Sequence, residues 1–265
     1  MNGHLWRNVA IGGFCVFLAA CGSKHNIQKT DEALGLDPED SPAELYVRMA
    51  EEYYNRGQTE VAFRRAQQAI EADKKYPRAQ VWAAFLYEQI GQVAEAQKHY
   101  ERAVKLAPNN SDVRHAYGAY ECRQKHYAEA DAQFKKALEN PLYTTPWVAM
   151  VNAGQCAEQA NDLTKATSHY RAALAANPAF GPALVKLAEL AHKRGDTAAA
   201  KGYLDRYFES DTVRTPATAY RALTLGVTVE RQLGNRKRAS DYERTLQKNF
   251  SQAPKTDAAP LKPTT

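Results

Sequence analysis

Apolar residues recur along this chain with a helical spacing, and the spacing itself repeats every 34 residues. Two stretches show it: AELYVRMAEEYYNRGQTEVAFRRAQQAIEADKKY from Ala43, and PRAQVWAAFLYEQIGQVAEAQKHYERAVKLAPNN from Pro77. Both have alanine at repeat positions 8, 20 and 27, tyrosine at 11 and glycine at 15. Positions 8 and 11, and again 20, 24 and 27, each form one face of a helix. Each unit is therefore predicted to be a pair of antiparallel helices.

Six copies of this unit follow one another. Small residues at positions 8 and 20 let the two helices approach closely, and glycine at 15 suits a left-handed turn. Lys125 and Asn161 replace that glycine in the third and fourth units, and the sixth unit keeps Gly234 and Ala239 with a start offset by five residues. The predicted repeats are 43–76, 77–110, 111–144, 147–180, 181–214 and 220–252.

The pattern resembles the tetratricopeptide repeat over about 210 residues. Stacked hairpins of this kind bury one continuous core, so the resemblance implies an all-α fold, a right-handed α-solenoid of six hairpins. Helix start signals support the boundaries, since Ser41, Thr145 and Thr215 each precede a proline. The solenoid is expected over 41–252, and the Pro-, Thr- and Lys-rich tail 253–265 is expected to be disordered.

An uncharged apolar run from Val9 to Ala20 follows Arg7 near the N-terminus. A spanning helix needs roughly 20 apolar residues, so residues 1–20 are interpreted as an export signal. The run ends in LAAC, which resembles the bacterial lipobox, although an incidental Cys21 is the alternative. The resemblance implies acylation of Cys21 and, with Gly22 next, a lipid anchor in the outer membrane facing the periplasm. Residues 21–40 are then the lipidated N-terminus and a flexible linker.

Composition and motifs mainly exclude classes of function. Losing Arg7 with the signal leaves 34 basic against 30 acidic residues, a balance of +4 too mild to argue for nucleic acid. The seven histidines include no HExxH and no pair four residues apart, and phosphate-loop and GxSxG motifs are absent. We expect no enzyme, no catalytic residue, no metal, no cofactor and no small-molecule substrate.

Cys122 and Cys156 are the cysteines left after the signal and Cys21. They fall at positions 12 and 10 of neighbouring first helices, at comparable height, so a disulfide between them is geometrically reasonable. It would close a loop of 34 residues and add roughly 3 to 4 kcal/mol on the chain-entropy model. Two buried free thiols are the alternative.

The resemblance to tetratricopeptide repeats implies that first helices line a groove, with positions 2, 5, 9 and 12 facing inward. In the first two units this gives a largely apolar patch, expected to bind an extended or helical peptide. The alternative is that the linker or the tail folds over it. The predicted groove residues are Val47, Glu51, Tyr54, Val81, Phe85 and Glu88.

Two longer phrases, AYGAYECRQKHYAEADAQFKKALENPLY (116–143) and NAGQC (152–156), resemble type IV pilus biogenesis lipoproteins of the PilF/PilW family. The resemblance implies a pilotin: an outer-membrane lipoprotein that binds the pilus secretin and promotes its localisation and multimerisation. It also implies the pairing of Cys122 with Cys156 and a secretin-binding role for the groove. Two alternatives remain: another lipoprotein adaptor, for cell-wall hydrolases or outer-membrane protein assembly, or an enzyme subunit whose active site is on a partner.

Overall fold

The computed structural model describes residues 41–210 and 215–251. Cys21, the predicted signal and linker, and the tail 253–265 lie outside these ranges. The described residues form twelve α-helices and no strand, and none of these helices has the length and apolar character needed to cross a membrane. In chain order they are α2 (Pro42–Asn55), α3 (Thr59–Ala72), α4 (Pro77–Gln89), α5 (Val93–Leu106), α6 (Ser111–Arg123), α7 (Tyr127–Leu138), α8 (Pro146–Gln159), α9 (Leu163–Ala176), α10 (Gly181–Lys193), α11 (Thr197–Glu209), α12 (Pro216–Gln232) and α13 (Arg236–Asn249).

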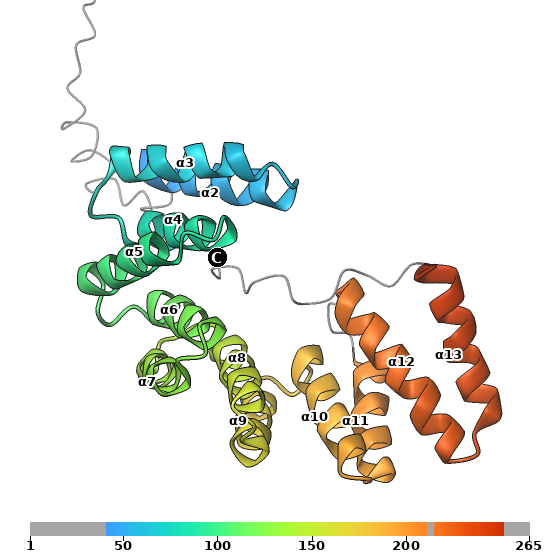
Figure 1. Ribbon diagram of the computed structural model, residues 1–265. Coiled ribbons are helices and arrows are strands. Elements are labelled where there is room, and N and C mark those ends of the chain that lie inside the picture. The colour runs from blue at the N-terminus through green and yellow to red at the C-terminus, as the bar shows by residue number, and fades with distance from the viewer. Residues whose placement is uncertain (1–40, 211–214, 252–265) are drawn as a thin grey trace, which may run out of the picture. The chain divides into compact units, whose positions relative to one another are not determined.

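The helices pair in chain order into six hairpins, from α2/α3 to α12/α13 (Figure 1). Each hairpin packs on the next through the contact of its second helix with the following first helix. Such nearest-neighbour contact is the organisation of a solenoid. The predicted fold class, an all-α solenoid of six tetratricopeptide-like hairpins, is confirmed.

A residue with positive φ stands at the turn of every described hairpin. Four of these turns use glycine, but Lys125 has φ 65° and Asn161 has φ 61°. A side chain in the left-handed region crowds its own backbone, at a cost of roughly 1 to 2 kcal/mol. The hairpin geometry therefore overrides local preference at these two positions.

The close helix approach predicted from position 8 is clearest at Gly154. A Cβ atom placed there would lie 2.5 Å from Cε1 of Tyr170, which is buried on α9. At Gly118 the same atom would lie 3.1 Å from the Phe134 ring and 3.2 Å from the carbonyl oxygen of Ala130. The aromatic rings of the second helices thus pack directly on the backbone of the first helices.

Apolar clusters lie between consecutive hairpins and hold the stack together. One joins α2, α3 and α4, a second joins α4, α5 and α6, a third joins α6, α7 and α8, and the largest extends from α8 to α12. The last helix, α13, buries only Ala239 among its side chains. A polar outer helix of this kind caps the end of a repeat stack.

The sixth hairpin begins earlier than its repeat start at residue 220. Its first helix, α12, starts at Pro216, where Oγ1 of Thr215 accepts a hydrogen bond from the backbone N–H of Thr218 at 3.2 Å. The cap and the proline set this boundary, which explains the extra length of the helix.

Candidate functional site

Three of the predicted groove residues are not available to a partner. Val47 and Phe85 are 0% exposed and belong to the core cluster of α2, α3 and α4, where the Phe85 ring lies 5.5 Å from that of Trp82. Val81 is 3% exposed and packs in the next cluster. The expectation of an apolar groove at these positions is wrong, because Val47 of α2 is packed against α3 and α4, and every residue of α4 from 79 to 86 is buried.

The other three predicted residues are partly exposed and bridge neighbouring first helices. Oε2 of Glu51 lies 3.3 Å from Nη2 of Arg78, and the Tyr54 hydroxyl donates to Oε1 of Gln89 at 3.2 Å. Glu88 accepts two hydrogen bonds from Arg123 of α6, at 2.6 Å and 2.7 Å. These side chains form a polar row across α2, α4 and α6.

Similar bridges join the later first helices. Nζ of Lys186 on α10 lies 2.9 Å from Oε2 of Glu158 on α8. Arg221 on α12 donates to both carboxylate oxygens of Glu189, at 2.9 Å and 2.6 Å. We call the whole row the first-helix seam; it comprises Glu51, Tyr54, Arg78, Glu88, Arg123, Glu158, Lys186, Glu189 and Arg221.

A buried acid stands at the beginning of this row. Glu44, 4% exposed, pairs with Arg78 and accepts a hydrogen bond from the Tyr76 hydroxyl at 2.5 Å. Burial, followed by the hydrogen bond to this carboxylate, raises the pKa of Tyr76 to about 12. Because Arg78 also reaches Glu51, one guanidinium bridges two acids of α2.

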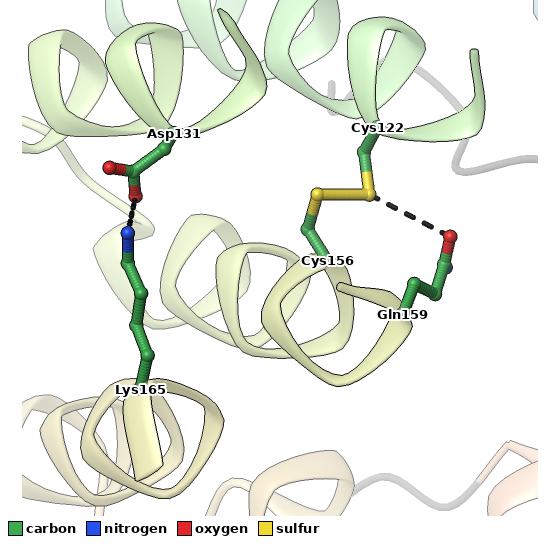
Figure 2. The surroundings of a disulfide bond; sticks show 5 residues. All are labelled: Cys122, Asp131, Cys156, Gln159 and Lys165. Carbon is green, nitrogen blue, oxygen red and sulfur yellow. Dashed lines mark hydrogen bonds and ion pairs between the residues drawn. A yellow bond between two sulfur atoms is a disulfide. The ribbon is translucent and has the colours of Figure 1, made fainter. Parts of the chain in front are cut away.

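At the α6–α8 junction the structure joins Cys122 and Cys156 by a disulfide, with their Cα atoms 5.7 Å apart (Figure 2). Both side chains are buried. Oε1 of Gln159 lies 3.9 Å from the Cys122 sulfur, a contact only, because a disulfide sulfur carries no hydrogen. A covalent bond therefore joins α6 to α8, whereas ion pairs join α4 to α6 and α8 to α10.

His115 lies in the same junction and is buried. Its Nε2 contacts the side-chain amide of Asn152 on α8, and its Nδ1 lies 3.2 Å from the Tyr143 hydroxyl. Burial, with a smaller contribution from the charge of Arg123, lowers its pKa to about 4. The ring is therefore neutral near pH 7 and serves as a polar link between α6 and α8.

The described residues contain no group of three or more His, Cys, Asp and Glu side chains arranged to hold a metal ion. What the seam offers is a row of partly exposed acids, guanidinium groups, one amine and one phenol. Such a surface suits recognition of a polypeptide. The sequence interpretation named the acids Glu51 and Glu88 but missed the basic partners Arg78 and Arg123, although opposite charges on successive first helices were a visible signal.

Comparison with known proteins places this architecture in a family. The tetratricopeptide repeat profile matches residues 53–120 and 157–223, about half of the chain. The type IV pilus assembly protein PilF of Pseudomonas aeruginosa is 24% identical over 242 residues, which cover 89% of this chain and 92% of PilF. An uncharacterized protein of Haemophilus influenzae is 31% identical over 121 residues, or 46% of this chain and 68% of that protein.

Two solved structures are also similar. That of PilW, described as a widely conserved type IV pilus biogenesis factor, superposes with a TM-score of 0.65 at 28% identity over 79% of this chain and 94% of PilW. The structure of Pseudomonas aeruginosa PilF gives a TM-score of 0.66 at 22% identity, covering 81% of this chain and 95% of that one. The second likeness shows a shared fold.

Proposed function

We propose that this chain, which belongs to the tetratricopeptide repeat family, is a type IV pilus biogenesis factor that binds the pilus secretin as a non-enzymatic scaffold. The observation that carries the proposal is similarity to PilF and PilW over most of the length of all three chains. Repeat scaffolds of this kind act by holding a partner, so we assign no reaction and no cofactor.

The proposal includes a lipid anchor. Cys21 precedes the described residues and would carry the acyl chains, with residues 22–40 as the tether between the outer membrane and α2. Several acyl chains, at about 0.8 kcal/mol per buried methylene, give lasting attachment, whereas one chain is marginal. The scaffold would then face the periplasm, where the proposed disulfide between Cys122 and Cys156 would persist. Mass spectrometry of the mature protein without reductant tests that bond, and two free thiols would show that it is not formed.

For the secretin we propose the part of the first-helix seam on α2, α4 and α6. Glu51, Tyr54 and Glu88 are partly exposed there, and Arg78 and Arg123 lie beside the acids. A segment that binds this surface would contribute charged and hydrogen-bonding side chains, because the apolar residues below it are already packed in the core. This polar surface replaces the apolar groove expected from the sequence.

A deletion strain tests the function directly. Loss of surface pili together with loss of heat-stable secretin multimers supports the proposal. Normal pili with altered cell-wall turnover would instead favour an adaptor for cell-wall hydrolases, and normal pili with defective outer-membrane proteins would favour a role in their assembly. Complementation with Cys21→Ser separates anchoring from binding, because secretin binding should persist while multimers no longer reach the outer membrane.

A further inference from the structure

A cavity of about 330 Å³ lies beside the disulfide, between the hairpin of α6 and α7 and that of α8 and α9. Tyr127 and Phe134 of α7 form one wall, and Ala153, Cys156 and Ala157 of α8 form another. Apolar cavities of about 150 Å³ already admit a benzene ring. The volume and lining are therefore sufficient for an aromatic group.

The cavity exists because α8 has small side chains where its neighbours have large ones. Ala153 and Cys156 stand at repeat positions 7 and 10. The preceding first helix has Tyr117 and Tyr120 at these positions, and the following one has Leu187 and Leu190. Cys156 is bonded to Cys122 of α6 (Figure 2). Its side chain therefore lines the cavity without filling it.

The preceding junction shows what fits such a space. There the ring of Tyr120 lies 4.8 Å from that of Tyr100, and its hydroxyl donates to the carbonyl oxygen of Val93 at 3.1 Å. Phe134 and Tyr127 occupy the repeat positions of Tyr100 and Val93 in the next hairpin. The cavity therefore has an aromatic ring, that of Phe134, and a backbone carbonyl, that of Tyr127, at the repeat positions that contact Tyr120 in the preceding junction.

We propose that this cavity binds an aromatic side chain, most suitably a tyrosine, inserted by a segment of a partner protein. The ring would pack on Phe134 and over Ala153 and Ala157, and its hydroxyl would donate to the carbonyl oxygen of Tyr127. Burying one aromatic side chain removes 150 Å² or more from water, which makes such residues effective anchors in interfaces. This site is separate from the first-helix seam, and the proposal holds whichever protein the chain serves.

With residues 1–20 removed as the proposed export signal, the ring would come from another chain. Residues 21–40, 211–214 and 252–265, which lie outside the described ranges, contain no Phe, Tyr or Trp. The mature chain therefore has no aromatic side chain in those segments that could fold back into the cavity.

A partner can reach the cavity from solvent. Ala128 and Ala160 at its edge are exposed, and beside them Nζ of Lys165 on α9 lies 2.7 Å from Oδ1 of Asp131 on α7 (Figure 2). This exposed pair joins the two hairpins at the rim without covering the apolar walls. A polar rim around an apolar interior is the usual form of an anchor pocket.

The experiment uses residues 21–265 with Cys21→Ser, folded under oxidising conditions and labelled on alanine methyl groups. The probe is p-cresol, the analogue of the tyrosine side chain, with 3-methylbutan-1-ol as an aliphatic comparison. We expect p-cresol to shift the methyl signals of Ala128, Ala153, Ala157 and Ala160 at millimolar concentration. The methyl of Ala103, buried in another cluster, should not move.

Ala153→Leu fills the cavity with the side chain found at this position in the next repeat. It should abolish the p-cresol shifts without lowering the melting temperature, whereas Ala198→Leu, at an exposed position on α11, should leave the shifts intact. Ala128→Leu at the exposed edge is the second closing variant, in case Ala153→Leu folds poorly. Absence of shifts in the parent chain, persistence of shifts in both closing variants, or equal shifts with 3-methylbutan-1-ol would each overturn the proposal.

Discussion

Arg123 of α6 donates two parallel hydrogen bonds to Glu88 of α4, from Nε to Oε1 at 2.6 Å and from Nη2 to Oε2 at 2.7 Å. The two side chains are only 21% and 10% exposed. Removing Arg123 would leave a largely buried carboxylate without its main partner. We expect Arg123→Ala to lower the free energy of unfolding by about 2 kcal/mol.

Urea unfolding measures this loss, and Arg56→Ala is the control. Arg56 pairs with Glu52 on α2, but both side chains are more than half exposed. Exposed pairs contribute about 0 to 1 kcal/mol, so the control should change little. Equal losses in the two variants would show that the Glu88–Arg123 bridge is no more than a surface contact.

Gly154→Ala tests the packing of the first helix against the second. The new methyl group would meet the Tyr170 ring at 2.5 Å, and the ring is buried with little room to move. We expect a loss of about 1 to 3 kcal/mol, measured by thermal or urea unfolding. Gly202→Ala on α11 is matched in chemistry but meets nothing within 4 Å, so it should be neutral or stabilising by up to about 1 kcal/mol.

Lys125→Gly relieves the left-handed turn between α6 and α7. Because glycine adopts positive φ without a steric cost, we expect a gain of about 0.5 to 1 kcal/mol in unfolding free energy. Asn161→Gly should gain less, since asparagine tolerates this region better than lysine. A melting temperature that falls in Lys125→Gly would contradict the assignment of strain to this turn.

Acid should destabilise the protein through His115. Its folded pKa of about 4 lies below the ordinary 6.5, so between these values the unfolded chain binds a proton that the folded chain does not. The contribution of neutral His115 to the free energy of unfolding is complete above pH 6.5. As the pH falls toward 4, the free energy of unfolding decreases by about 3 kcal/mol.

Urea unfolding at pH 7 and at pH 4.5 measures the effect, with His115→Gln as the variant that cannot titrate. The variant should lose less stability on acidification than the parent. A residual dependence is expected from His99 and His169, whose pKa values burial also lowers. Identical pH dependence in the two proteins would exclude His115 as the source.

The sequence predicted the repeat and the turns well because both depend on local features. Alanine at the packed positions and glycine at most turns are visible within a single unit, and the six hairpins follow from them. The groove at Val47, Val81 and Phe85 failed for a physical reason. A first helix contacts its own second helix and both neighbouring hairpins, so an apolar residue on almost any of its faces is already packed.

The bridges of the seam were harder to find from sequence. Glu88 and Arg123 are 35 residues apart, and their pairing depends on the height of α4 relative to α6, which no single unit encodes. The cavity was also hidden, because it is visible only when Ala153 and Cys156 are compared with the larger residues of the neighbouring repeats. Contacts and cavities between two repeats could therefore be found only from the structure.

The proposed binding of the secretin to the N-terminal part of the first-helix seam is tested by reversing one ion pair at a time. The variant Glu88→Arg with Arg123→Glu retains an ion pair but reverses its polarity, and Glu189→Arg with Arg221→Glu makes the same exchange at the α10–α12 junction. Each is expressed in the deletion strain, and unchanged melting of the purified proteins shows that both fold.

The decisive measurement is the amount of heat-stable secretin multimer in these two strains. We predict that the exchange at Glu88 and Arg123 reduces the multimer to the level of the deletion strain, whereas the exchange at Glu189 and Arg221 leaves it at the wild-type level. Wild-type multimer in the Glu88 and Arg123 strain would contradict the claim.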